Sequence, residues 1–176
     1  MTYSIRPGRR AEADLLREIE RAAGQAFIAA GHPGVATFEP THGDDLRDAV
    51  GDGCLFVAVD QTDHPIGFLL CSELDEDLYV QELNVHPDHA GNRLAVPLLA
   101  AADRLAKGLG LAALTLTTFR HVPWNAPYYA RLGFTIIPDD AIGPDLRFVI
   151  ARQQQAGLDV SQRVAMRRPL TREAAA

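Results

Sequence analysis

The stretch from Leu78 to Ala106 holds the residue types and spacing that most directly suggest chemistry. An apolar, β-rich run over residues 79–85 is followed by Ala90-Gly91-Asn92-Arg93-Leu94-Ala95 and then by apolar residues at helical spacing. A strand that turns through a glycine into a helix directs several backbone N–H groups, and the positive end of the helix, toward one point. This segment therefore predicts an anion site suited to a phosphate chain.

The elements that must position this turn follow from hydrophobic periodicity and from turn residues. Apolar residues three and four apart predict helices over 9–30 (with a weak point at Gly24), 44–50, 93 or 94 to about 108, 126–132 and 144–155. Apolar or alternating runs predict strands over 4–6, 54–59, 66–71, 79–85, 111–118, 134–137 and 160–167. Residues 35–43 are expected to form a loop.

The order of these elements predicts how the strands are connected. Three successive strands, 54–59, 66–71 and 79–85, are joined by short polar connectors and predict an antiparallel meander. The helix that follows leads into the strand at 111–118, and a strand–helix–strand unit of this length makes its two strands parallel. Asn125 is predicted to cap the short helix after it, with Pro127 in the first turn.

Composition limits the classes of protein to which the chain can belong. Its 176 residues suit one domain with a sizeable core, and 47% of them are apolar, as in ordinary globular proteins. The net charge of −6 argues against a protein that binds nucleic acid by neutralising phosphates. We therefore expect one domain over residues 1–170, with residues 171–176 as a disordered tail.

The two cysteines and the apolar segments bear on the compartment. Cys54 and Cys71 lie in apolar surroundings and are interpreted as buried thiols in a reducing compartment. The chain shows no apolar signal core near residue 1 and no run of about 20 apolar residues that would span a bilayer. We expect a cytoplasmic protein without membrane contact.

Three segments, taken together with the element order, give the sequence a resemblance to a known family. LYVQELNVHP (78–87) looks like the fourth strand of the GCN5-related N-acetyltransferase (GNAT) superfamily, and HAGNRLAVPLL (89–99) looks like its acetyl-CoA pyrophosphate loop. WNAPYYARLGF (124–134) resembles the later segment in which an asparagine precedes a helix that bears a tyrosine. The resemblance covers about residues 4–168. It implies an α/β (α+β) fold: a mixed, mostly antiparallel sheet of six or seven strands flanked by helices, with 79–85 and 111–118 as the parallel pair.

One departure from the family pattern falls within the loop. The family carries Arg/Gln-x-x-Gly-x-Gly/Ala, whereas here Ala90 stands at the leading position and Arg93 replaces the first glycine. We interpret Arg93 as a residue of the first helical turn that does not need a positive φ, with a guanidinium able to reach a phosphate.

The resemblance assigns the cosubstrate site. Acetyl-CoA is expected to bind through the backbone of the turn formed by Ala90, Gly91, Asn92, Arg93, Leu94 and Ala95. Leu83 and Val85 would face the pantetheine arm, with the Val85 N–H turned toward the thioester carbonyl by a bulge in the strand. Asn125 would also contact the CoA arm. No metal is expected, because the six histidines show no metal-binding spacing.

Two residues are predicted to move protons. Tyr129 occupies the position where many family members carry a general acid, which would protonate the departing CoA thiolate. Glu82 is the preferred base, because an alkylammonium with a pKa near 10.4 must lose a proton before it can attack. His121 is a rival for that role.

The acceptor is expected to be the primary amine of a small molecule, attacked directly in a ternary complex. Phe27, His121 and Trp124 are candidates to contact it, and the acidic residues at 44, 45 and 73–77 favour a cationic amine. A non-catalytic CoA-binding or sensing module on the same fold is the alternative, and a protein-interaction domain that has lost the cofactor is a third reading. A homodimer formed through the C-terminal strand is also possible.

Overall fold

The computed structural model describes residues 3–170. The chain forms two compact units, each discontinuous in sequence. The first contains the chain up to Ser72 together with Val80–Ala102, and the second contains Glu73–Tyr79 together with the chain from Asp103 onward. The predicted tail at 171–176 lies outside the described residues.

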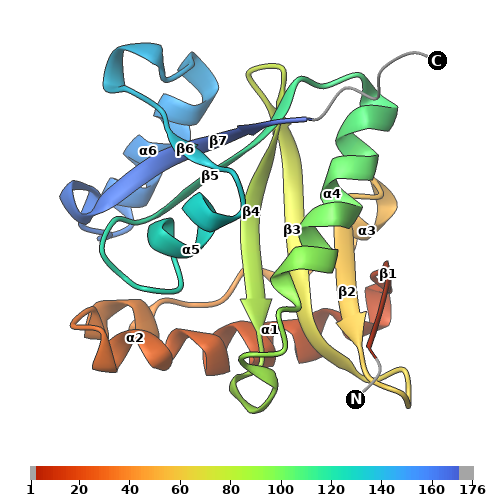
Figure 1. Ribbon diagram of the computed structural model, residues 1–176. Helices are drawn as coiled ribbons and strands as arrows, with labels where there is room; N and C mark the ends of the chain where they lie inside the picture. The colour runs from red at the N-terminus through yellow and green to blue at the C-terminus, as the bar shows by residue number, and fades with distance from the viewer. Residues whose placement is uncertain (1–2, 171–176) are drawn as a thin grey trace. The chain divides into compact units, whose positions relative to one another are not determined.

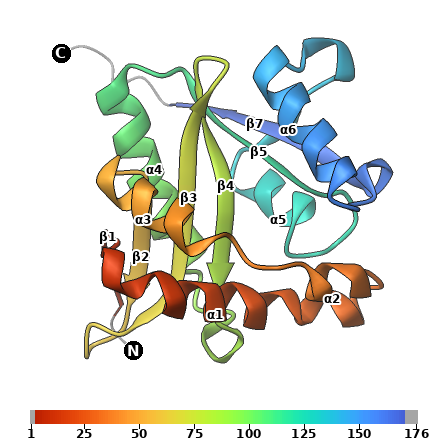
Figure 2. The same cartoon turned by 180° about the vertical axis from the view of Figure 1, so that it is seen from behind.

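The strands follow the order β1-β2-β3-β4-β5-β7-β6. The sheet is mixed and has seven strands, in agreement with the prediction of six or seven, and β4 and β5 are its one parallel pair. The strands are β1 (Ser4–Pro7), β2 (Leu55–Val59), β3 (Pro65–Leu74), β4 (Asp77–Val85), β5 (Ala113–Phe119), β6 (Thr135–Ile136) and β7 (Arg163–Pro169). Figures 1 and 2 show the arrangement from opposite sides.

The first unit is built from β1, β2, β3 and most of β4, with helices packed on them. Its helices are α1 (Ala13–Gly24), α2 (Ala26–Ala29), α3 (Gly43–Gly51) and the start of α4 (Ala95–Leu109), with short 3-10 helices η1 (Arg10–Glu12), η2 (Pro33–Thr37) and η3 (Pro87–His89). Alternate residues of β2 and β3 point inward and meet apolar residues at helical spacing on α1 and α3. This core contains Leu16, Ile19, Leu46, Leu55, Val57, Phe68 and Leu70.

The second unit contains β5, β7, β6 and the first residues of β4. Its helices are α5 (Ala126–Arg131), α6 (Pro144–Gln155) and the end of α4, with the 3-10 helices η4 (Asp139–Ala141) and η5 (Val160–Gln162). Leu146 of α6 packs on Tyr79 and Ala165, and Ile142 and Ile150 pack against this cluster. β7 pairs antiparallel with β5 along its full length and with β6 at Met166 and Arg167. It is therefore an internal strand, which leaves less of its edge for the dimer pairing considered above.

The predicted elements are confirmed to within a few residues, with three differences. The helix over 9–30 is divided, and Gly24 is the last residue of α1, as the weak point suggested. Part of the predicted loop at 35–43 belongs to the 3-10 helix η2. The final strand begins at Arg163 and not at 160, because the Asp159 carboxylate accepts from the Ser161 N–H at 3.0 Å and caps η5 there.

No helix among residues 3–170 combines the length and the apolar character needed to cross a membrane.

Candidate functional site

The predicted anion turn lies in the first unit, between β4 and α4. Gly91 and Arg93 both have positive φ angles, of 83° and 56°. Residues 90–93 are exposed, whereas Leu94 and Ala95 are buried and anchor the start of α4. Carbonyl groups accept the first bonds of the helix, from Val96 N–H to Arg93 and from Leu98 N–H to Leu94. The turn therefore projects exposed backbone at the N-terminus of a 15-residue helix.

The expectation that Arg93 needs no positive φ is wrong. Its φ of 56° lies in the left-handed region, where the Cβ of an L-residue approaches the following carbonyl oxygen. Two left-handed residues, Gly91 and Arg93, reverse the chain within this short turn. The position at which the family pattern carries glycine thus has the backbone conformation that glycine adopts most easily.

Hydrogen bonds of the His86 and Asn92 side chains stabilise the segment that leads into this turn. The Nδ1 atom of His86 accepts from the Asp88 N–H at 3.3 Å, which caps η3. The Asn92 side-chain amide donates to the His89 carbonyl at 3.0 Å. The Asn92 amide therefore holds the turn itself, and it is through its backbone that Asn92 can meet an anion.

The residues of this turn fit the diphosphate of acetyl-CoA. Gly91 has no atom within 4 Å of the position that a Cβ would take, so its backbone is open to a ligand. In the first turn of α4, Val96 and Leu98 already donate to the Arg93 and Leu94 carbonyls and Pro97 has no N–H, so the backbone that can meet a ligand is that of the turn before Val96. The helix dipole favours an anion at this end. Arg93 adds a cation there.

At the end of β4, the predicted base Glu82 lies on the opposite face of the strand from Leu83 and Val85, the two residues predicted to meet the pantetheine arm. Glu82 is half-buried, and its Oε2 accepts from the Asn84 amide at 3.0 Å, so the two share one face. Leu83 and Val85 alternate with them. Asn84 orients the Glu82 carboxylate. Sequence reasoning missed this role, although the i, i+2 spacing of the two polar residues was a signal.

A glycine in the neighbouring strand β3 faces the end of β4. A Cβ on Gly67 would lie 2.9 Å from the Asn84 carbonyl oxygen and 3.3 Å from the Val85 Cα. The pairing continues past this point, because the His86 N–H donates to the Ile66 carbonyl at 2.9 Å. Glycine inside a strand often marks close backbone approach or a bulge. The bulge at Val85 remains a prediction.

Asn125, in the second unit, holds its helix in a different way from the one predicted. Its backbone carbonyl accepts from Tyr128 and Tyr129, so it stands at the N-cap position of α5, but its side chain makes no capping bond. The side chain is buried, and its Oδ1 accepts a hydrogen bond from the Thr118 hydroxyl on β5. The predicted side-chain cap is therefore wrong, because the amide turns into the unit toward Thr118. Its contact with the CoA arm remains a prediction.

Tyr129 is half-buried on α5 and packs against a buried ring. Its ring meets Phe134 edge to face at a centroid distance of 5.6 Å. The adjacent Tyr128 lies under the guanidinium of Arg131, 5.4 Å from the ring centroid. The two tyrosines therefore have different surroundings, as the 100° step of a helix requires.

The three residues predicted to contact the acceptor fall in different units. Phe27, on α2, is half-buried in the first unit. His121 and Trp124 are exposed in the second unit, between β5 and α5, and Trp124 is 45% exposed. Their contact with an acceptor remains a prediction.

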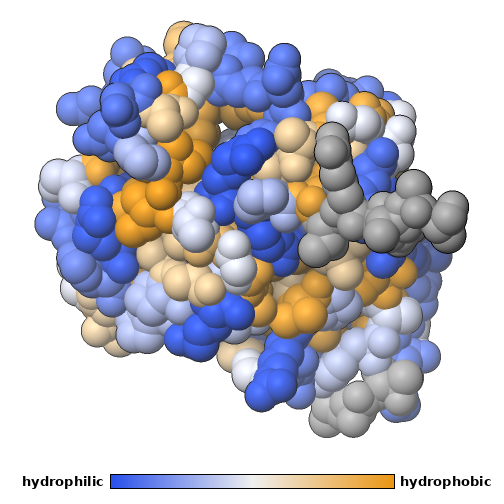
Figure 3. Space-filling model, turned by 45° about the horizontal axis from the view of Figure 1, so that its top comes forward, coloured by the Kyte–Doolittle hydropathy of each residue, from blue (hydrophilic) through white to orange (hydrophobic). Residues whose placement is uncertain are grey.

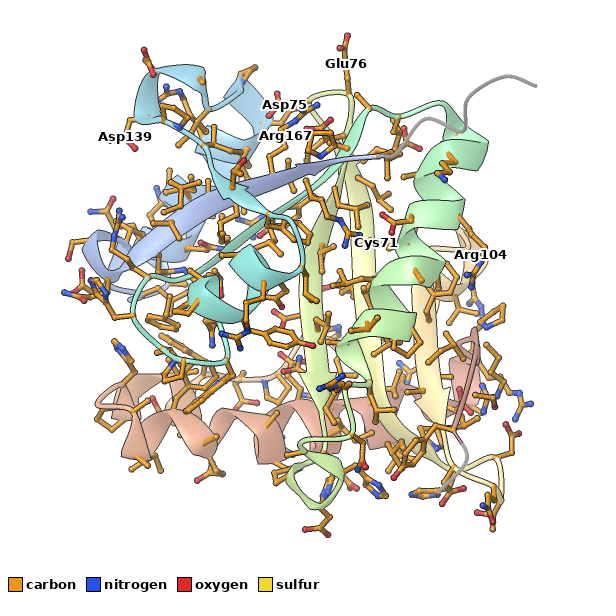
Figure 4. All side chains as sticks on the ribbon, viewed as in Figure 1. Cys71, Asp75, Glu76, Arg104, Asp139 and Arg167 are labelled. Carbon is orange, nitrogen blue, oxygen red and sulfur yellow. The ribbon has the colours of Figure 1, made fainter. Side chains whose placement is uncertain are left out.

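Three of the six acidic side chains that favoured a cationic acceptor, those of Asp44, Asp75 and Asp77, are already engaged within the protein. Asp44 pairs with Arg47 at 2.8 Å, and Asp77 is buried against Arg167 in a two-point pair of 2.6 and 2.8 Å. Asp75 accepts from backbone N–H groups of α6. Figure 4 shows Asp75 and Arg167 near the turn between β3 and β4, with Glu76 pointing outward. These pairs weaken the argument for a cationic acceptor.

Neither metal chemistry nor an activated thiol is evident in residues 3–170. Within that part of the chain no three His, Cys, Asp or Glu side chains gather in a way that would hold a metal ion. Cys54 and Cys71 form no disulfide, and Cys71 is buried with its thiol near the Cys54 carbonyl. Burial raises the pKa of the Cys71 thiol, which makes it a poor nucleophile.

Comparisons with known proteins agree with this arrangement. Residues 15–134 match the family model described as the acetyltransferase (GNAT) family. The chain is similar to an acetyltransferase of the GNAT family from Staphylococcus aureus Mu50, with a TM-score of 0.72 and 13% identity over 97% of this chain and 100% of that one. It is also similar to the PaiA N-acetyltransferase from Thermoplasma acidophilum in complex with coenzyme A (TM-score 0.65, 15% identity, 96% and 99% covered). A third similar structure is the ribosomal-protein-S18-alanine N-acetyltransferase from Escherichia coli (TM-score 0.64, 15% identity, 98% and 97% covered).

Proposed function

Since the chain belongs to the acetyltransferase (GNAT) family and is therefore an acyltransferase that uses acetyl-CoA, we propose that it acetylates the primary amine of a small molecule by direct attack. The observation that carries the cosubstrate assignment is the turn with two left-handed residues at the start of α4. In this proposal the backbone of residues 90–95 binds the diphosphate, and the Val85 N–H donates to the thioester oxygen as negative charge develops there.

Proton transfer is assigned to two side chains. Glu82 accepts the proton that the ammonium must lose, with its carboxylate oriented by Asn84. The amine nitrogen then bonds to the acetyl carbon and the carbon–sulfur bond breaks. Tyr129 gives a proton to the departing thiolate, and the second proton that the nitrogen loses returns to Tyr129 directly or through water. His121, exposed after β5, is the second candidate for the base.

Direct attack is supported by the state of the cysteines. A covalent route needs an activated nucleophile, and the burial that raises the pKa of Cys71 opposes thiolate formation. The proposal also places the protein in a reducing cytoplasm, which agrees with two cysteines that form no disulfide.

The test is acetyl-CoA-dependent release of free thiol across a panel of primary amines. We expect Tyr129→Phe and Glu82→Gln each to lower kcat by about 10²- to 10⁴-fold, in the range of general acid–base catalysis. Tyr128→Phe is the matched control and should retain activity. Turnover that survives Tyr129→Phe would exclude the general-acid role. If Glu82→Gln is active and His121→Gln is not, His121 is the base.

A further inference from the structure

The second unit contains a cavity of about 390 Å³ that plays no part in the roles assigned above. Its walls come from one face of α6 (Arg147, Ile150, Ala151 and Gln154), from β6 and from β7. The spacing of the α6 residues, three and four apart, places them on one side of the helix. Figure 3 shows an apolar band bordered by hydrophilic side chains on the part of the molecule where β6 and α6 lie. The volume is that of an ordinary small-molecule site.

The cavity is cationic in an acidic protein. Three arginines, Arg120, Arg147 and Arg163, line it against a single carboxylate, the exposed Asp139. The whole chain has a net charge of −6, so the cavity departs from the average of its surface. A low-dielectric wall beside such charges strengthens their attraction for an anion.

Neutral groups hold two of these guanidinium groups in place. Arg147 donates through Nε to the Ile142 carbonyl at 3.0 Å and through a terminal nitrogen to the Asp139 carbonyl. Arg163 donates to the carbonyl and hydroxyl of Thr117, at 3.1 and 3.2 Å. A carbonyl fixes a guanidinium but does not cancel its charge, and the five N–H donors of Arg147 exceed the two that these carbonyls use.

Two other arginines of the same unit, Arg167 and Arg168, differ from those of the cavity because they are paired with carboxylates. Arg167 is paired at two points with Asp77, and Arg168 at two points with Asp103, at 2.7 Å for both bonds. Within residues 3–170, Arg120 and Arg147 have no such carboxylate partner. The paired arginines stabilise the fold, whereas Arg120 and Arg147 keep their charge available to a ligand.

The remaining lining combines apolar side chains with a hydrogen-bonded polar pair. Ile137, Ile142 and Ile150 are partly buried in the core of the unit and also line the cavity. Gln153 and Thr117 also line the cavity, and the Gln153 amide donates to the Thr117 hydroxyl at 2.8 Å. A ligand that satisfies both surfaces must carry an anionic group on an apolar body.

We propose that this cavity binds a small organic acid through Arg120, Arg147 and Arg163, with its apolar body against the isoleucines. The planar fork of a guanidinium matches a carboxylate at two points. The carboxylate belongs either to the amine acceptor or to a separate effector, and this second part of the assignment rests on the proposed acetyl transfer.

Binding is tested first, without any reaction. 4-Methylpentanoate and phenylacetate are titrated against the full chain by calorimetry and by amide NMR, beside their neutral primary amides and inorganic phosphate. We expect the two acids to bind at least 10-fold more tightly than their amides, and Arg120→Gln to weaken acid binding at least 10-fold. Arg152→Gln, also an exposed residue of α6 but not in the lining, is the control and should change nothing.

Ala151→Phe gives a second variant, which fills the cavity from α6 without removing a cation and should abolish binding. The proposal is overturned if neither acid saturates, if the amides bind equally well, if phosphate binds and the acids do not, or if Arg120→Gln binds both acids normally. Because these readouts do not involve acetyl-CoA, failure of the acetyltransferase assignment would leave them interpretable.

Kinetics then separate the two sources of the carboxylate. If it belongs to the acceptor, Arg120→Gln raises KM for amino acids such as leucine but not for 3-methylbutylamine, which lacks the carboxylate. If it belongs to an effector, 4-methylpentanoate changes the turnover of 3-methylbutylamine in the parent protein and not in Arg120→Gln. If Arg120→Gln leaves the KM for leucine unchanged and 4-methylpentanoate does not change the turnover of 3-methylbutylamine, the cavity does not serve the reaction. The assignment of the carboxylate to an acceptor or an effector is then wrong.

Discussion

The Asp75 carboxylate caps the N-terminus of α6, accepting from the N–H of Leu146, 71 residues further along the chain, at 2.9 Å. Its other oxygen accepts from the Asp145 N–H at 3.0 Å. A Cβ at Gly143, the N-cap position, would collide with this carboxylate. The turn between β3 and β4 therefore supplies the cap that the helix's own N-cap residue cannot, and so positions one wall of the cationic cavity.

Removing this cap should destabilise the protein. Asp75→Ala leaves two N–H groups of α6 without their acceptor, and we expect a loss of about 1–2 kcal/mol in the free energy of unfolding. Urea denaturation measures it, with the neighbouring Glu76→Ala as control, since both residues have positive φ. Equal losses in the two variants would contradict the capping role.

Gly67 is predicted to be required by the end of β4. In Gly67→Ala the new Cβ meets the backbone of Asn84 and Val85, which cannot move aside as a flexible side chain would. We expect a loss of about 1–3 kcal/mol, as for overpacked cores, together with a lower kcat. Gly108→Ala is the control: it lies in α4 with open space around it and should gain up to about 1 kcal/mol. A neutral Gly67→Ala in the same denaturation assay would argue against close packing at this point.

Replacing Arg93 with glycine is expected to raise the stability of the fold and to lower its affinity for CoA. Arg93→Gly relieves the left-handed conformation and is expected to stabilise the fold by about 1 kcal/mol. If its guanidinium meets a phosphate, the same variant binds CoA several-fold more weakly, and more so at low salt. Arg93→Gln, which keeps a side chain at this φ but removes the charge, separates the two effects. Thermal unfolding with and without CoA gives both quantities, and tighter CoA binding by Arg93→Gly would exclude the phosphate contact.

Stability should depend on pH through Glu20. Burial of its carboxylate raises the pKa above its ordinary value, a shift that hydrogen bonds from Thr41 only partly oppose. The folded state then holds the proton more tightly than the unfolded chain, so stability falls as pH rises from the ordinary value of 4.5 through the raised pKa. Glu20→Gln keeps an acceptor for Thr41 without the charge. It should therefore be more stable than the parent at pH 7, with the difference vanishing below pH 4.5.

The matched control for this prediction is the exposed Glu18→Gln on the same helix. Urea denaturation at pH 4, 5.5 and 7 measures all three proteins. A Glu20→Gln variant that is less stable than the parent at pH 7 would show that the ionised carboxylate contributes stability there.

Local periodicity was enough to predict most of the fold. α6 begins and ends at the residues expected, because Pro144 suits a first turn and Gly157, with a φ of 97°, suits the chain reversal after a helix. The parallel pairing of β4 and β5 followed from one intervening helix, α4. The first inference depends on residues that are near neighbours in the chain, and the second on the order of three consecutive elements.

The tertiary structure decided which groups the polar side chains contact and which backbone conformation single residues adopt. The neighbouring residues in the sequence predict that the Asn125 side chain caps α5, yet its amide oxygen accepts a hydrogen bond from Thr118 of β5. Arg93 was expected to be helical, yet its φ is positive because the turn must reverse within a few residues. Arg120, Arg147 and Arg163 share no spacing in the sequence, and only the packing of α6 against the strands brings them to one cavity. A side-chain hydrogen bond or a cavity depends on groups far apart in the chain, which hydrophobic periodicity does not encode.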